Sequence, residues 1–190
     1  MSGLSAPARG GSSGKWVTPE EGLYEAHVID VDKVPNPYYN PETDRDNKKT
    51  QFKWTIELDE SSLPNPDKED EKWSTRFPYY TGTQLGWHAR NKLTGFLRKV
   101  MKDFVYDPEA NDGAGEMTSF KDLDDLKNQT KGLPLRVMTE HNIKKVDGET
   151  RVYQNAKAIM SSNKGKLSVA ELMQRNLGAS DVRFEDDIDF

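Results

Sequence analysis

Aromatic and basic residues are interleaved along several segments of this 190-residue chain. Flat rings can stack on nucleobases or sugars, and lysine and arginine can neutralise phosphates, so this combination suits binding of a polymer more than covalent chemistry. The candidate binding residues are Tyr38, Tyr39, Lys48, Lys49, Lys53, Arg76, Tyr80, Arg151, Tyr153 and Lys157.

Residue types that support catalysis are present without the required spacing. His27, His88 and His141 fall in different predicted elements, and none has a metal-type partner nearby in the sequence. The chain has no cysteine, which excludes disulfides and thiolate metal sites. No nucleophile elbow, Walker loop or dinucleotide fingerprint occurs. The sequence therefore predicts neither an enzyme nor a cofactor or metal.

The charge is unevenly distributed, although the formal net charge is −5. Residues 181–190 hold five acids and one base, residues 60–72 five acids and two lysines, and residues 107–125 seven acids and one lysine. The rest of the chain is therefore basic. A basic body with acidic segments outside it favours an anionic ligand.

The hydrophobic pattern predicts a chain of mainly β structure with one or two helices. Alternation predicts strands at 23–31, 50–58, 73–81, 133–140 and 151–160, and Asp147-Gly148 predicts a hairpin between the last two. Helical spacing predicts a long amphipathic helix over 84–104, with Thr83 as a candidate cap, and a short one over 168–177 that begins with a capping box.

Three strands, a helix and two strands is the element order of an OB-fold. This fold is a five-stranded Greek-key barrel with a helix between strands three and four, which binds oligonucleotides or oligosaccharides across strands two and three. Here its loops would be long. The predicted organisation is a flexible arm at 1–15, the OB domain at 16–162, a linker with a short helix at 163–180 and an acidic tail at 181–190.

The strand pattern divides the candidate residues between core and surface. In the second strand Trp54 lies on the apolar face, whereas Lys53 lies on the opposite face. In the third strand the larger apolar set of Trp73, Phe77 and Tyr79 fits the core, which turns Arg76 and Tyr80 outward. Pro78 indicates either an edge strand or a bulge near the end of the strand.

The remaining candidates lie in the first loop and the fifth strand. The loop at 34–49 holds two tyrosines outside the core, and Lys48 and Lys49 are expected to hold phosphates. In the fifth strand Tyr153 and Lys157 share a parity, so both are expected to face outward.

The chain closes with the sequence D-D-I-D-F, which resembles the acidic tip of bacterial and phage single-stranded DNA-binding proteins. In those families the tip often reads D-D-I-P-F, and here Asp189 stands where the proline is common. The stretch Q-F-K-W-T-I-E-L, followed by a Tyr-Thr-Gly turn and a helix that contains L-G-W, is similar to phage-encoded OB proteins of replication and recombination modules.

This resemblance implies a non-catalytic protein that coats single-stranded DNA with little sequence preference during replication, recombination and repair. It also implies that the tail docks a polymerase, helicase, primase or recombinase. The tail residues concerned are Phe184, Glu185, Asp186, Asp187, Ile188, Asp189 and Phe190. No apolar run is long enough to span a membrane and no secretory signal is visible, so we expect a cytoplasmic protein, in the bacterial host if phage-encoded.

Two other classes remain open at this stage. A carbohydrate-binding or structural virion β-barrel protein would also use aromatic platforms, and its binding would depend little on salt. A nuclease or other enzyme is the third, and it lacks the expected site residues.

Overall fold

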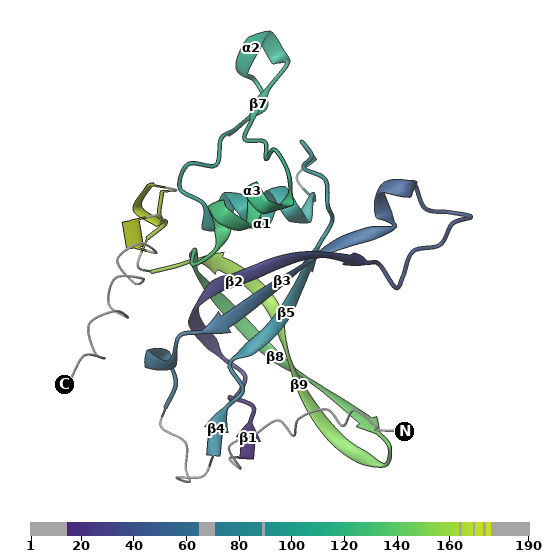
Figure 1. Ribbon diagram of the computed structural model, residues 1–190, viewed down its shortest axis with the longest axis vertical. Coiled ribbons are helices and arrows are strands. Elements are labelled where there is room, and N and C mark those ends of the chain that lie inside the picture. Colours follow the sequence, from purple (N-terminus) through teal and green to yellow (C-terminus); the bar gives the residue numbers. More distant parts are fainter. Residues whose placement is uncertain are drawn as a thin grey trace, which may run out of the picture.

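A curved, five-stranded antiparallel sheet forms the body of the protein (Figure 1). The computed structural model describes residues 15–64, 71–88, 90–163, 165–168, 170–172 and 174–175. Nearly all of the predicted arm and the whole predicted tail at 181–190 lie outside these residues. The sheet strands are β2 (Leu23–Pro35), β3 (Thr50–Leu58), β5 (Arg76–Thr81), β8 (Pro134–Val146) and β9 (Glu149–Ser161).

The spatial order of the strands is β5-β3-β2-β8-β9. The two edge strands, β5 and β9, lie next to each other. Within the described residues they exchange no ladder hydrogen bonds, so the sheet curls round without closing. The prediction of a mainly β chain with five principal strands is confirmed, but the expected closed barrel is not formed.

The predicted third strand is in fact two strands. The chain forms β4 (Glu71–Trp73), which pairs in parallel with β1 (Lys15–Val17), and then β5 after a break at residues 74–75. Trp73 therefore belongs to a small separate sheet and not to the core face of β5. Of the two alternatives predicted from Pro78, the edge strand is found, because β5 is outermost in the sheet.

The predicted long helix over 84–104 is wrong in extent. The helix found there is α1 (Lys92–Val100), and its N-cap is Asn91, whose Oδ1 accepts from the Thr94 N–H at 2.9 Å. Within the described residues 84–88 and 90–91, which precede α1, no helix is formed, so Thr83 is not the cap of a helix. Apolar spacing alone did not reveal where the backbone hydrogen bonds begin.

Further short elements lie on both sides of α1 in the chain. They are η1 (Asp46–Lys48), η2 (Glu60–Ser62), β6 (Tyr106–Asp107), α2 (Ala110–Gly113), β7 (Glu116–Met117) and α3 (Leu123–Thr130). The helices thus outnumber the one or two expected. The capping box near residue 168 is confirmed, because Ser168 and Glu171 exchange both hydrogen bonds.

The core lies between the concave face of the sheet and α1. Trp54 is 0% exposed, as predicted, and its Nε1 donates to Thr81 Oγ1 at 2.9 Å. Its ring lies 4.6 Å from that of Phe96 on α1. Because Trp54 and Phe52 alternate with polar residues, burying this face of β3 turns Lys53 and Thr55 to the convex side.

The hairpin of β8 and β9 extends well beyond the sheet as a two-stranded ribbon (Figure 1). Its turn is formed by Asp147 and Gly148, with φ angles of 53° and 82°. Two positive φ values at the central residues are typical of the type I′ turn that the Asp-Gly pair predicts. The 36–49 loop projects to the same side of the sheet, with β5 between the two projections.

Candidate functional site

Lys53 and Tyr80 lie side by side on the convex face of the sheet. They are direct cross-strand partners in the β3–β5 ladder, and directly opposed side chains in such a ladder are in reach of each other. Tyr80 is 38% exposed. A cation beside an exposed ring is the arrangement needed for a phosphate next to a stacked base.

The carboxylate of Asp32 on β2, next to Lys53, forms an ion pair with a different lysine. Asp32 is the β2 partner of Lys53, and its Oδ1 lies 3.0 Å from Lys127 Nζ on α3. Lys127 also lies 3.3 Å from Asp30, and these acids raise its pKa, chiefly through the hydrogen bond that Lys127 donates to Asp32. Lys53 has no ion-pair partner among the described residues, so its charge is available to a ligand.

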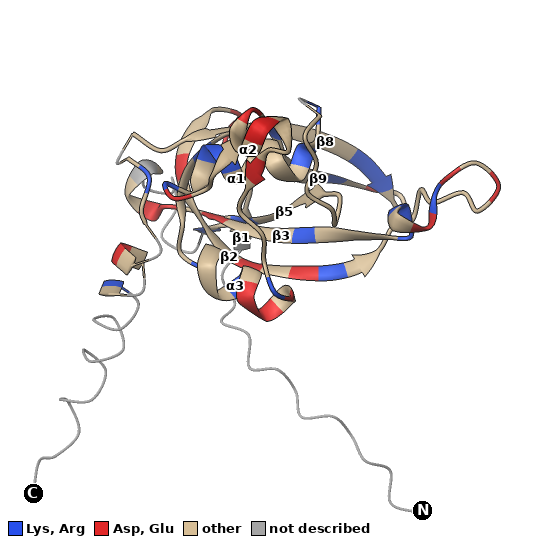
Figure 2. Ribbon diagram, turned by 90° about the horizontal axis from the view of Figure 1, so that it is seen from above, with Lys and Arg blue, Asp and Glu red and all other residues tan. Residues whose placement is uncertain are grey.

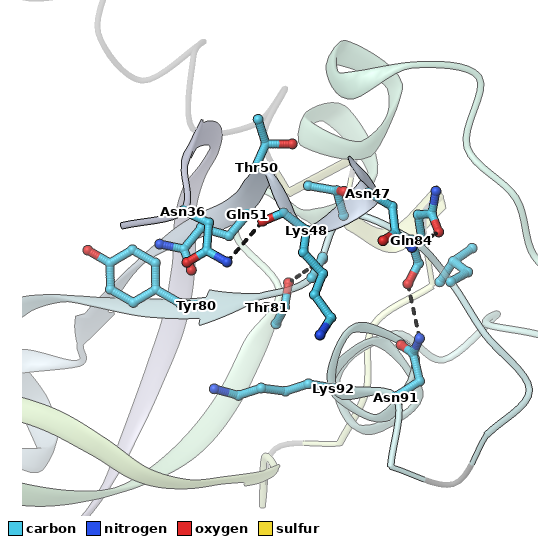
Figure 3. A pocket seen from close by; sticks show the side chains of 13 residues that line it. Asn36, Asn47, Lys48, Thr50, Gln51, Tyr80, Thr81, Gln84, Asn91 and Lys92 are labelled. Carbon is cyan, nitrogen blue, oxygen red and sulfur yellow. Dashed lines mark hydrogen bonds between the residues drawn. The ribbon is translucent and has the colours of Figure 1, made fainter. Parts of the chain in front are cut away.

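A polar pocket of about 440 Å³ opens beside Tyr80, where the 36–49 loop, the end of β5 and the start of α1 meet (Figure 3). We call it the Tyr80 pocket. Its lining includes the side chains of Asn47, Lys48, Gln51, Tyr80, Gln84 and Lys92. None of the described residues that line it is an aspartate or glutamate.

Two lysines reach into this pocket from opposite sides. Figure 3 shows Lys48 descending from the loop and Lys92 extending from α1 across the same opening. Lys48 Nζ is held by Asp44 at 2.7 Å, whereas Lys92 has no carboxylate partner within the described part of the chain. The Lys92 ammonium lies 4.4 Å from the centre of the Tyr79 ring, and desolvation lowers its pKa.

The 36–49 loop holds the other tyrosine and lysine candidates, but its cations are already paired. Lys49 Nζ lies 3.0 Å from Asp46 Oδ1 and 6.0 Å from the centre of the Tyr39 ring. Desolvation and the hydrogen bond to Asp46 raise the pKa of Tyr39. Tyr38 is 88% exposed and is the freest ring in the loop.

Arg76 lies away from this surface, at the other end of β5. Four residues separate it from Tyr80, which corresponds to roughly 13 Å along a strand. Its Nε donates to Glu57 Oε1 at 2.6 Å. His27 lies 3.5 Å from Glu57 and 2.8 Å from Asp59, so this end of the convex face is acidic. The shared parity of Arg76 and Tyr80 does not place them in one cationic patch.

A second aromatic and basic group lies where β1 meets the ribbon. We call it the ribbon surface and define it by Trp16 of β1 and by Arg151, Val152 and Tyr153 of β9. These residues line one shallow pocket. Trp16 is 65% exposed and Tyr153 41%. Arg151 lies 3.8 Å from Glu149, a weak ion pair at the tip of the ribbon.

Lys157 is exposed for a different reason than the sequence indicates. Met138 pairs with Ala158, and the next residue, Thr139, pairs with Ala156. Lys157 is thus the extra residue of a β-bulge, which shifts the alternation of β9 between Tyr153 and Ile159. A strict period of two therefore does not hold along β9, although Tyr153 and Lys157 are both exposed.

The candidate residues thus form separate groups. Lys48 and Tyr80 line the Tyr80 pocket, and Lys53 is the cross-strand partner of Tyr80. Arg151 and Tyr153 lie on the ribbon surface, and the others lie elsewhere. Figure 2 shows that acidic residues gather on α2, on α3 and in the 36–49 loop, while basic residues are spread over the sheet.

Sequence reasoning gave no role to several residues that complete these groups. They are Lys92, Gln51, Gln84 and Trp16. The available signal was the cluster of amides around the ends of the first loop and the third strand. Amides of this kind are common in loops for local reasons, which hides a shared site.

The comparisons with known proteins add no identification. No protein-family model matches the chain, and no curated protein shows significant sequence similarity to it. Within the described residues, no group of three or more metal-ligating side chains is placed to hold an ion. In the same part of the chain, no helix is long and apolar enough to cross a membrane.

Proposed function

We propose that this chain is a non-catalytic, OB-type protein that binds single-stranded DNA in replication, recombination and repair. The observation that carries the proposal is the Lys53–Tyr80 pair beside a pocket whose described lining residues include Lys92, without a carboxylate partner, and no acid. Single-strand binding needs this combination of a stacking ring and cations that follow the backbone.

The strand order supports the OB-type assignment. Numbered in chain order, the five sheet strands lie in the order third, second, first, fourth, fifth, and α1 comes between the third and the fourth. This is the order of an OB barrel opened between its third and fifth strands, the two that lie next to each other here. The 36–49 loop and the ribbon then correspond to the loops that flank an OB binding groove.

A salt series with labelled oligonucleotides tests this function. Fluorescence anisotropy with single-stranded oligodeoxythymidine should show binding at low salt, with affinity that falls steeply as salt rises. The duplex of the same length should bind more weakly, since its bases are not free to stack. Absence of single-strand binding at low salt would refute the proposal.

The salt dependence also separates the proposed function from the carbohydrate alternative. The amides of the Tyr80 pocket would suit a sugar, because hydroxyl groups need paired donors and acceptors. Binding of a neutral oligosaccharide should change little with salt, in contrast to DNA. A glycan array at two ionic strengths, run beside the DNA titration, distinguishes the two.

For the acidic segment 181–190, we propose docking to a replication or recombination enzyme, such as a polymerase, helicase, primase or recombinase. Its carboxylates suit a basic pocket and the rings of Phe184 and Phe190 suit an apolar slot. Removing residues 181–190 should leave or increase affinity for single-stranded DNA and abolish partner capture. A sharp loss of DNA affinity on truncation would contradict this role.

A further inference from the structure

The Tyr80 pocket has more hydrogen-bonding capacity than a phosphate-binding surface needs. A surface that only follows the backbone requires cations and donors, whereas reading a base edge requires donors and acceptors held close together. The side chains of Gln51, Asn47 and Gln84 bring both kinds of group to the pocket.

The amides of Asn47 and Gln84 are held in a defined arrangement by each other. Asn47 Nδ2 donates to Gln84 Oε1 at 2.8 Å, which joins the 36–49 loop to the segment after β5. This bond uses one donor and one acceptor, so an amide oxygen on Asn47 and an NH₂ group on Gln84 remain for a ligand. The amide of Gln51 has no hydrogen-bond partner among the described residues.

The neighbouring amides of Asn91 and Asn36 are not available to a ligand in this way, because their hydrogen bonds are made within the protein. Asn91 caps α1 through its oxygen and donates to Gln84 O at 3.1 Å. Asn36 donates to Lys48 O at 2.9 Å and accepts from the Tyr38 N–H. The pocket therefore has a rigid polar frame, and Gln51, Asn47 and Gln84 are the amides left to recognise a ligand.

A phosphate position lies beside these amides. Lys92 is unpaired among the described residues and its ammonium is partly desolvated against Tyr79, a cost that an anion would relieve. The same lysine is the first residue of α1, where the N-terminal end of the helix adds a positive partial charge. Tyr80 belongs both to the pocket and to the Lys53–Tyr80 pair. A DNA strand bound along the convex face at Lys53 and Tyr80 would therefore pass the opening of the pocket.

We propose that the Tyr80 pocket is a base-selective subsite, in which one nucleotide places its base edge against Gln51 and the Asn47–Gln84 pair. Its phosphate lies beside Lys92. This inference rests on the proposed function and replaces indifference to sequence with a base preference at one position. The pocket volume of about 440 Å³ is within the usual range for small-ligand sites.

The test compares homopolymers of deoxythymidine, deoxycytidine and deoxyadenosine of equal length, about 15 nucleotides, within the site sizes known for OB folds. Anisotropy titrations at one salt concentration should give affinities that differ by about fivefold or more, in line with the discrimination of a good base contact. Gln51→Ala breaks no hydrogen bond of the described structure and should reduce the differences to within about twofold, as expected when the base contact is lost.

Two further variants separate base reading from charge. Lys92→Ala should weaken all three homopolymers by a similar factor and lower the salt slope by about 0.7, the value for one phosphate of a single strand. Asn128→Ala, an exposed amide on α3, is the matched control and should change neither property.

The possible outcomes separate the two proposals. If wild-type protein binds all homopolymers equally and with steep salt dependence, the subsite is refuted and the proposed function stands. A preference that survives in Gln51→Ala also refutes the subsite. If no single strand binds at low salt, both proposals fail.

Discussion

Lys53→Ala should weaken single-strand binding and flatten its salt dependence, whereas Arg76→Ala should change both very little. Sequence reasoning treats the two cations alike, since both face outward from neighbouring strands. In the structure Lys53 is beside Tyr80 with no acid bound to it in the described residues, whereas Arg76 Nε lies 2.6 Å from Glu57.

The expected magnitude follows from counterion release. Each phosphate of a single strand that a protein neutralises contributes about −0.7 to the slope of log K against log salt. Removing Lys53 should therefore make the slope shallower by about 0.7. For a fourfold rise in salt, the loss of affinity in wild-type protein should then be about 2.6 times the loss in Lys53→Ala.

We expect Arg76 to contribute to the folded state through its pair with Glu57, and not to ligand binding. Its hydrogen bond and charge interaction with Glu57 raise its pKa, so it is a cation at every pH of interest. The pair is largely exposed on the arginine side, and its loss should cost at most about 1 kcal/mol of unfolding free energy. Without Arg76 the acidic end of the convex face becomes more acidic, which gives a bound strand no new contact.

The assay is a set of parallel anisotropy titrations with oligodeoxythymidine across a salt series, with Lys121→Ala as an exposed lysine control outside both surfaces. Circular dichroism of each variant verifies that the sheet is intact. An equal change of slope in Lys53→Ala and Arg76→Ala would refute the idea that only the Lys53 end of the convex face binds DNA. An unchanged slope in Lys53→Ala would show that Lys53 does not contact a phosphate of the bound strand.

Three further predictions concern stability, all measured by urea denaturation. Trp54→Ala should lower the free energy of unfolding by about 3–5 kcal/mol through lost core packing, whereas exposed Trp16→Ala should change it by less than about 1 kcal/mol. Asn91→Ala should cost about 1 kcal/mol, because the first turn of α1 loses its cap. Hydrogen bonds from Lys48 and Lys49 lower the pKa values of Asp44 and Asp46, so the stability that these pairs contribute is present at neutral pH and is lost as pH falls below the ordinary value of 3.8. The double variant Asp44→Asn, Asp46→Asn should therefore lose less stability on acidification than wild-type protein, and an identical loss would contradict this.

The sequence determined the elements whose signals are local. Strict alternation over 50–58 predicted β3 with its correct ends, because one face of that strand is fully buried and the other is not. The Asp147-Gly148 turn and the Ser168–Glu171 capping box were also predicted correctly, since their residues bond within a few positions of each other. The exposure of Tyr80 and burial of Trp54 follow from the same alternation.

Only the tertiary structure decided which of these residues act together. Alternation places Lys53, Arg76 and Tyr80 on the same face. It does not reveal that Arg76 forms an ion pair with Glu57 or that Asp32 forms one with Lys127. Those pairings depend on strand register and on the position of α3, which are contacts between residues far apart in the chain. The Tyr80 pocket has the same origin, because it exists only where the first loop, the end of β5 and the start of α1 meet.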